Sequence, residues 1–387
     1  SPTTPNGVAT GTFSSTVAGP HTVSATVGGT AAAQQPTVTV NPASQASLAF
    51  VVQPSSVVAG AAIAPAVQLE LRDAFGNRVT SATDLVTVVI ASNPGGGTLS
   101  GTLTRAAVAG VVAFNDLSVN RSAPGYTLSA TSGTLTGALS SAFAVAVGGV
   151  STTTSTVSVS SGSVASGSGV TVTLQAKDAS GNNLTTGGLT TVAFTRSGGT
   201  STGTFGSVTD NGNGTYSAAF TGVVAGSATT IGATIGGVAV TTPLPAVMVT
   251  PGPASTATSV VSVSSPSVTS GNTVTLTFQA KDAAGNNLTT GGAAIVFTRT
   301  GGTSTGTFGS VTDNSNGTYS AAFTGVLAGT ATTIGATIAG SAVTGTLPTV
   351  TVSPGAISTS QSVVTVSSST VTSGSAVTLR LQAKDAA

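Results

Sequence analysis

Three aspartates begin a short string that returns along the chain, and they are the residues whose type and spacing come nearest to a metal site. Asp178 and Asp282 each begin an Asp-x-x-Gly-Asn string. Asp385, near the end of the chain, is followed by Ala as Asp178 and Asp282 are. Calcium takes about six to eight oxygen ligands, several of them from carboxylates. Each near-copy repeat offers only two acids, Asp178 with Asp210 and Asp282 with Asp313. Because Asp caps its own backbone and Gly-Asn accepts positive φ, we favour turns here and keep Asp178, Asp282 and Asp385 as weak calcium candidates.

Two lysines stand directly before these aspartates and raise the question of an isopeptide cross-link. Such a bond needs a buried Lys amine that attacks an Asn side chain beside a carboxylic acid. Lys177 and Lys281 follow strand-like segments, and Lys177 shares the outward phase of Thr171 and Thr173. Lysines are rarely buried. We therefore predict surface lysines and no cross-link.

The remaining polar residues do not assemble a catalytic or cofactor site. His21 is the only histidine and the chain has no cysteine, which excludes a zinc site and a catalytic triad built from this sequence. No spacing pairs the few carboxylates for acid–base chemistry. We predict no catalytic residue, no cofactor-binding residue, no cofactor and no enzyme activity.

Two arginines share the phase of apolar neighbours at the end of a predicted strand. Arg196 and Arg299 each stand before a Gly-rich loop. One interpretation is that each side chain extends from the rim of the domain into solvent. The other is an ion pair with Asp210 or Asp313, and the sequence leaves both open.

The composition indicates a folded chain with little electrostatic attraction for partners. Of 387 residues 39% are hydrophobic, while only 5% are charged, against about 25% in ordinary proteins. With a net charge of +1 the chain has no excess of positive charge to attract nucleic acid or an anionic membrane, so neither is expected as a partner. No apolar run reaches the roughly 18 residues that a membrane span requires.

The elements that must position these residues are strands. In the segments 170–176 and 274–280 every second residue is apolar, which predicts strands with one buried and one wet face. Leu379 and Leu381 continue this pattern near the end of the chain, and Phe13 and Val38 take core positions near its start. No apolar stripe has helical spacing. The fold class is all-β, with turns that favour antiparallel sandwiches.

The chain repeats with a period of about one hundred residues, which is the length of a small domain and too long for a solenoid unit. We predict the C-terminal part of an Ig-like repeat at 1–43, a divergent sister-type repeat at 44–149, and near-copies of each other at 150–254 and 255–355. The N-terminal part of a further repeat occupies 356–387. Short Pro-bearing linkers favour an elongated, semi-rigid rod.

Two motifs carry a resemblance to a known family. The turn Asp178-Ala-Ser-Gly-Asn-Asn183 and the string Val208-Thr-Asp-Asn-Gly-Asn-Gly-Thr-Tyr216 resemble bacterial Ig-like domains of invasin and intimin type. The second motif is also similar to filamin-type repeats. Residues 45–149 resemble a sister type, through Ala113-Phe-Asn-Asp-Leu-Ser-Val119 and Gly125-Tyr-Thr-Leu-Ser-Ala130. The resemblance implies tandem domains that hold a binding tip away from a bacterial cell or virion.

From these features we expect a structural stalk or fibre segment of an extracellular or cell-surface protein, which has copies of itself as its partners. Uncharged Thr- and Ser-rich strands leave sheet edges unguarded, which favours lateral or end-to-end self-association. Two other functions stay open: an adhesin whose repeats bind a host or surface ligand directly, and an accessory segment of a secreted enzyme or phage tail protein. Both ends fall inside a repeat. We expect a window of a longer chain, with a strand-sharing joint between molecules as the alternative.

Overall fold

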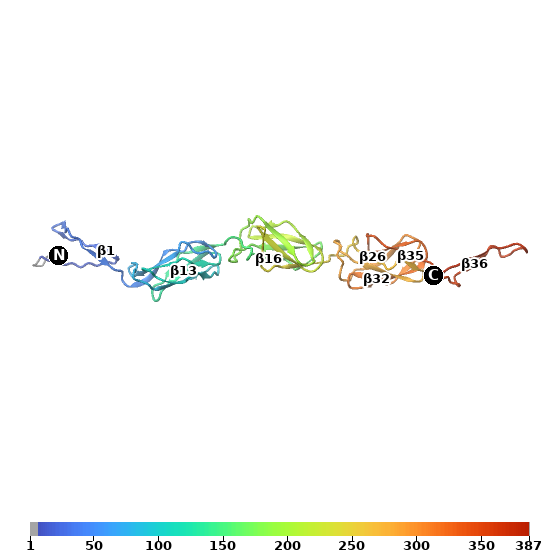
Figure 1. Ribbon diagram of the computed structural model, residues 1–387, viewed down its shortest axis with the longest axis horizontal. Helices are drawn as coiled ribbons and strands as arrows, with labels where there is room; N and C mark the ends of the chain where they lie inside the picture. Colours follow the sequence, from blue (N-terminus) through green and yellow to red (C-terminus); the bar gives the residue numbers. More distant parts are fainter. Residues whose placement is uncertain (1–6, 387) are drawn as a thin grey trace. The chain divides into compact units, whose positions relative to one another are not determined.

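The computed structural model describes residues 7–386, and within them it contains strands and no helix (Figure 1). Contacts divide the chain into two compact units. The first runs to Thr156 and includes 175–187 and 212–215, and the second comprises 157–174, 188–211 and the chain from Tyr216 onward. The prediction of an all-β chain of tandem Ig-like sandwiches is confirmed.

The first unit is built from short strands and four long ones. The strands are β1 (Gly19–Thr22), β2 (Thr26–Val27), β3 (Thr30–Ala31), β4 (Thr37–Val40), β5 (Gln45–Val52), β6 (Val57–Val58), β7 (Val67–Asp73), β8 (Leu85–Ser92), β9 (Leu99–Ser100), β10 (Thr104–Ala106), β11 (Val111–Phe114), β12 (Ser118–Val119), β13 (Ala123–Thr131), β14 (Ala138–Leu139) and β15 (Phe143–Ala146). One sheet has the order β10-β8-β13-β15-β6, with β14 on β13, and another has the order β11-β7-β5.

A single core joins these two sheets into a sandwich. Leu69 and Leu71 from β7 pack in one cluster with Val88 from β8, Phe114 from β11 and Leu128 from β13, all almost completely buried. The apolar side chains that alternate along β7 therefore face the sheet that contains β8 and β13, as the sequence predicts.

The second unit contains the strands of the two near-copy repeats and those that follow residue 355, except that three strand residues, Thr156, Gln175 and Thr215, fall in the first unit. The strands are β16 (Thr156–Val159), β17 (Ser163–Ala165), β18 (Gly169–Gln175), β19 (Val192–Ser197), β20 (Thr202–Phe205), β21 (Thr209–Asp210), β22 (Thr215–Val224), β23 (Thr229–Ile235), β24 (Val238–Ala239), β25 (Ala246–Thr250), β26 (Val260–Val263), β27 (Ser267–Thr269), β28 (Thr273–Gln279), β29 (Ile295–Thr300), β30 (Thr305–Phe308), β31 (Thr312–Asp313), β32 (Thr318–Leu327), β33 (Thr332–Ile338), β34 (Ser341–Ala342), β35 (Thr349–Ser353), β36 (Val363–Val366) and β37 (Leu379–Gln382).

The two near-copies have the same topology. In the later one the orders are β26-β28-β32-β30 and β27-β35-β33-β29, and in the earlier one the second sheet is β17-β25-β23-β19. β26 pairs with β28 in the first of these sheets and β27 pairs in parallel with β35 in the second, so the first segment of the repeat contributes to both sheets. Leu276, Phe323, Ile334 and Val350 bring residues of both sheets into one buried core.

A buried tyrosine fastens a loop in each complete repeat. The hydroxyl of Tyr319 accepts the N–H of Ala293 at 2.8 Å, and that of Tyr216 accepts the N–H of Leu189 at 2.9 Å. In the sister-type repeat, by contrast, the Tyr126 hydroxyl donates to the carbonyl of Arg121 at 2.8 Å. The hydrogen bond thus runs in opposite directions in the two sequence types.

Core positions predicted at the two ends of the chain are exposed, which corrects the expectation for them. Leu379 and Leu381 are 68% and 66% exposed, and Phe13 and Val38 are 46% and 40% exposed. Within residues 7–386, β36 pairs only with β37, and β1 pairs only with β4. A two-stranded sheet without a second sheet across it cannot bury an apolar face.

Candidate functional site

The Asp-x-x-Gly-Asn string folds into a turn held by its own aspartate. Asp282 Oδ1 accepts the N–H groups of Ala284 at 3.0 Å and Asn286 at 2.9 Å. The Asp282 carbonyl accepts the N–H of Gly285, whose φ of +86° lies in the region that glycine adopts without strain. The result is a tight loop that directs the Asn286 side chain outward from its own sandwich.

The second carboxylate oxygen holds the linker that enters the repeat. Asp282 Oδ2 accepts the N–H of Gly252 at 2.9 Å and Asn286 Nδ2 at 2.8 Å. Asp282 is only 1% exposed. A buried carboxylate without a cationic partner requires such donors, because its charge is otherwise costly to desolvate.

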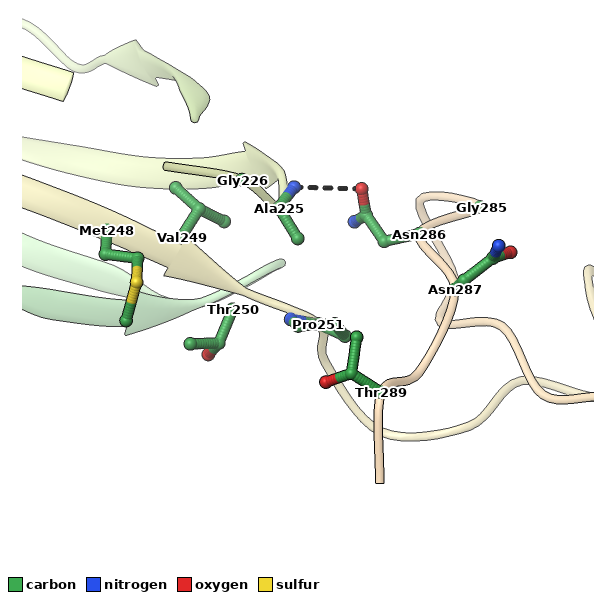
Figure 2. A pocket seen from close by; sticks show the side chains of 10 residues that line it. All are labelled: Ala225, Gly226, Met248, Val249, Thr250, Pro251, Gly285, Asn286, Asn287 and Thr289. Atoms are coloured by element: carbon green, nitrogen blue, oxygen red, sulfur yellow. Dashed lines mark hydrogen bonds between the residues drawn. The ribbon is translucent and has the colours of Figure 1, made fainter. Parts of the chain in front are cut away.

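The asparagine then pairs with the backbone of the preceding repeat. Asn286 Oδ1 accepts the N–H of Ala225 at 2.9 Å, and Asn286 Nδ2 donates to the carbonyl of Val223 at 2.8 Å. Figure 2 shows Asn286 directed at Ala225, while the adjacent Asn287 points away from it. One side chain therefore connects two sandwiches, and we call the Asp–Asn pair with these bonds the clasp.

The same clasp is present one repeat earlier. Asp178 accepts the linker N–H of Gly148 at 2.9 Å and the N–H of Ser180 at 3.0 Å. Asn182 Nδ2 lies 2.9 Å from Asp178 Oδ2. Asn182 donates to the Asn120 carbonyl at 3.0 Å and accepts the Ser122 N–H at 3.1 Å, and these two bonds complete the second clasp.

A third clasp begins at Asp73, which the sequence-based prediction missed. Asp73 accepts the linker N–H of Ala43 at 2.9 Å and hydrogen-bonds Asn77 Nδ2 at 2.9 Å. Asn77 in turn accepts the N–H of Ala18 at 2.9 Å and donates to the carbonyl of Thr16 at 2.9 Å. The string Asp73-Ala-Phe-Gly-Asn77 has the same spacing as the other two, so the motif alone is a signal that finds it.

At Asp385 the structure contains the linker half of the arrangement. Asp385 Oδ2 accepts the N–H of Gly355 at 2.8 Å, as Asp282 does with Gly252. Thr258 Oγ1 also donates to the Asp282 carbonyl at 2.6 Å, which adds a side-chain bond between the start of the repeat and its turn.

Hydrogen bonding keeps these carboxyl groups ionised despite their burial. Burial raises the pKa of Asp73, but donors from Asn77, Ala43 and Phe75 outweigh it and lower the pKa from 3.8 to about 2. For Asp178 and Asp282 burial also raises the pKa, and the bonds from the linker N–H and the clasp asparagine again bring it below its ordinary value. The clasp is therefore formed by carboxylates, not carboxylic acids, near neutral pH.

Two open cavities flank the joint around Asn286. One, of about 620 Å³, is shown in Figure 2 and is lined by Met248, Pro251, Asn287 and Thr289 among others. The other, of about 580 Å³, lies beside Gly252 and Asp282. The joint is thus held at the clasp and open on its flanks.

The weak calcium candidates lie in the clasps and do not form a carboxylate cluster. In the described part of the chain, no group of three or more His, Cys, Asp or Glu side chains could hold a metal ion. Both carboxylate oxygens of Asp178 and of Asp282 accept N–H donors. The chemistry of these sites is hydrogen bonding of backbone and amide groups.

The other residues singled out from the sequence contribute no side chain to the clasp hydrogen bonds described above. Lys177 and Lys281 are half-buried, and each pairs through its backbone with the second Asn of the turn. Arg196 and Arg299 are exposed at the ends of β19 and β29. His21 Nε2 lies 2.7 Å from the Val17 carbonyl.

Residues 7–386 include no helix with the length and apolar character needed to cross a membrane. Comparison with curated proteins gives no match.

Several solved structures of bacterial surface proteins are similar to this chain. The adhesin FdeC of Escherichia coli is 26% identical with a TM-score of 0.40, over 82% of this chain and 100% of that chain. Invasin, a bacterial integrin-binding protein, is 20% identical with a TM-score of 0.40, over 83% of this chain and 60% of that chain. InvD of Yersinia pseudotuberculosis is 26% identical with a TM-score of 0.36, over 61% of this chain and 71% of that chain.

The family described as invasin, domain 3, matches the chain twice, at residues 151–252 and again at residues 255–355. These ranges coincide with the two near-copy repeats that carry the clasps at Asp178 and Asp282. The resemblance to bacterial Ig-like repeats of invasin type is confirmed. Since the two matches together span more than half of its residues, the chain belongs to the invasin domain 3 family.

Proposed function

We propose that this chain is a stalk segment of a bacterial surface protein, with Ig-like repeats at 44–149, 150–254 and 255–355 between parts of repeats at 1–43 and 356–387. Its work is mechanical. The repeats provide reach, and the joints limit how far neighbouring repeats bend. The role involves no catalysis, no cofactor, no nucleic acid and no contact of this segment with a membrane, and it places the segment at the cell surface or outside the cell.

The observation that carries the proposal is the clasp, which occurs at three successive joints with the same bonds. A flexible linker between independent domains needs no buried carboxylate and no amide that pairs with the neighbouring backbone. In the joint at Asn286, the N–H groups of Gly252 and Ala225 donate hydrogen bonds and the carbonyl of Val223 accepts one, all in addition to the covalent linker. Several bonds at different points of a joint oppose rotation about any one of them.

Small-angle X-ray scattering of the full chain tests this role. The double variant Asn182→Ala with Asn286→Ala removes the amide of two clasps, and we expect a smaller maximum dimension with a wider spread of shapes. The matched control, Asn183→Ala with Asn287→Ala, changes the neighbouring exposed asparagines. If the two double variants scatter alike, and both keep folded repeats by circular dichroism, the joints are not stiffened by the clasp.

Self-association is the second part of the proposal, and an uncharged sheet face favours it. On the outer face of β28 and β32, Thr275 lies opposite Ala322 and Thr277 lies opposite Ser320. Such a face carries no charge to keep a second copy away. Analytical ultracentrifugation at rising concentration should show that the original chain associates and that the double variant Thr275→Lys with Ala322→Lys does not. If the original chain and the double variant associate to the same extent, the proposed self-association through this face is wrong.

Direct binding of a host or surface ligand by the repeats is the other candidate function, favoured by the open cavities at the joint. Met248 is 42% exposed and lines the larger cavity without taking part in the clasp. If the repeats are the adhesive part, Met248→Arg should reduce attachment of cells that display the chain. If they are a stalk, attachment depends on other domains and remains unchanged.

A further inference from the structure

The three clasps contact neighbouring repeats at pairs of positions where the carbonyl residue differs each time, being Thr, Asn or Val, while the N–H residue is small, being Ala or Ser. Each asparagine pairs with one carbonyl and with the N–H two residues later. The paired residues are Thr16 with Ala18, Asn120 with Ser122, and Val223 with Ala225. The second pair lies in the sister-type repeat and the third in a near-copy repeat, so both sequence types present the same two backbone groups.

The side chains at these positions do not take part in the contact. Asn120 turns its amide oxygen to the N–H of Thr98, at 2.7 Å, within its own sandwich. Val223 and Ala225 have no polar side-chain atom at all. The asparagine amide, with its oxygen accepting and its nitrogen donating, binds these two groups as the C=O and N–H of one residue of a parallel neighbour strand would.

The backbone pair is kept in position by the repeat that carries it. In the near-copy, Ser166 Oγ donates to the Val223 carbonyl at 2.8 Å, next to the bond from Asn286 Nδ2. The carbonyl therefore uses both lone pairs, one for its own repeat and one for the next. This arrangement defines the end of a repeat as a docking surface made of main-chain atoms.

We infer that the clasp recognises the end of a neighbouring repeat through its backbone alone, so that a repeat of either sequence type is an equivalent partner. Repeats that are inserted, deleted or reordered then form the same joint without any compensating substitution. This inference rests on the geometry of the joints and is independent of the stalk role.

The first test exchanges the side chains of two joints within the full chain. Val223→Asn with Ala225→Ser places the residues of the second joint at the third. The readout is hydrogen exchange of the Asn286 Nδ2 protons, followed by NMR with ¹⁵N-asparagine labelling. We expect them to exchange about tenfold more slowly than those of exposed Asn287, in both the original chain and the double variant.

Two further variants show that the protection comes from the backbone contact. Ala225→Pro removes the N–H donor but keeps a small apolar side chain, and it should make exchange of the Asn286 Nδ2 protons faster than in the original chain, because the amide loses one of its two backbone bonds. If this proline prevents folding, Asn286→Asp serves instead, because the aspartate cannot donate to Val223, and the exchange of the Ala225 amide is then followed. Loss of protection in Val223→Asn with Ala225→Ser, with the repeats still folded, would overturn the inference.

The second test creates a joint that this chain does not contain. Deletion of residues 149–252 places Pro253 directly after Gly148, so Asn286 meets Asn120 and Ser122 of the sister-type repeat. We expect Asn286 Nδ2 protons to keep their slow exchange, equal within about twofold to the full chain. Fast exchange in a deletion chain whose two remaining repeats are folded would show that side chains select the partner.

Discussion

The carboxylate of Asp282 and the side-chain amide of Asn286 form one hydrogen-bonded unit, with Asn286 Nδ2 2.8 Å from Asp282 Oδ2. One amide proton is fixed on the carboxylate, which leaves the other directed at the Val223 carbonyl, also at 2.8 Å. Asp282 therefore acts on the joint twice. It binds the linker N–H of Gly252 directly, and it orients the side chain that holds the preceding repeat.

Replacement of Asp282 by Asn should destabilise both the turn and the joint. An asparagine offers one acceptor oxygen, so its NH₂ group would face N–H donors from Gly252 or Ala284. A buried donor without a partner costs about 1–3 kcal/mol. We expect Asp282→Asn to lower the free energy of unfolding of residues 255–353 by that amount, measured by urea-dependent hydrogen exchange of β28 and β32 peptides. Asp84→Asn, which changes an exposed carboxyl, is the control, and an equal effect of both would contradict the prediction.

The two directions of the tyrosine bond predict unequal costs. Tyr319→Phe leaves the Ala293 N–H without its acceptor, whereas Tyr126→Phe leaves the Arg121 carbonyl without one donor. Carbonyls, with two lone pairs, tolerate a lost partner more often than buried N–H groups do. We expect about 1–3 kcal/mol for Tyr319→Phe and a smaller loss for Tyr126→Phe, each measured by exchange of its own repeat. The reverse order would show that packing of the ring, and not the hydrogen bond, decides the cost.

The linker should require glycine at position 252, because the backbone there lies close to the Ser166 carbonyl oxygen. A Cβ at Gly252 would lie 2.7 Å from the Ser166 carbonyl oxygen, whereas a Cβ at Gly149 would meet no atom within 4 Å. Gly252→Ala must therefore displace the linker from Ser166 and lengthen its bond to Asp282. In Gly252→Ala we expect the backbone amide of residue 252 to exchange about tenfold faster or more. In the control Gly149→Ala we expect no change in the exchange of the Gly148 amide, which is bound to Asp178. Equal behaviour of both variants would mean that the linker adjusts without loss.

The sequence predicts the sandwiches because burial follows a simple alternation. Leu276 and Phe278 are buried and Thr275 is exposed, as a period of two requires. Leu379 and Leu381 have the same pattern but are exposed, because burial also needs a second sheet. The aspartate turn is local and follows from residue type. The contact of Asn286 with Val223 and Ala225 does not, because it joins residues far apart through backbone groups that carry no sequence signal.

Calcium should leave the joints unchanged. The carboxylate oxygens of Asp178 and Asp282 already accept N–H donors, and an ion would have to break these bonds while finding few other carboxylates. We expect the melting temperature of the full chain to be the same in calcium and in a chelator, measured by differential scanning calorimetry. A rise with calcium that Asp178→Asn with Asp282→Asn abolishes would make these aspartates metal ligands.

Acid should open the joints only well below the pH at which an ordinary carboxyl takes up its proton. The pKa of Asp73 is about 2 in the folded chain, below its ordinary 3.8, because bonds from Asn77, Ala43 and Phe75 outweigh the effect of burial. A group with a lowered folded pKa contributes stability that is complete above the unfolded pKa and is lost as the pH falls through the folded one. We therefore expect a constant melting temperature from pH 9 to about pH 4 and a decline between about pH 4 and pH 2. In an NMR titration, the Ala43 and Phe75 amide shifts should report the Asp73 protonation with a midpoint near 2. A midpoint near 3.8 would show that the carboxylate is not held by these donors in solution.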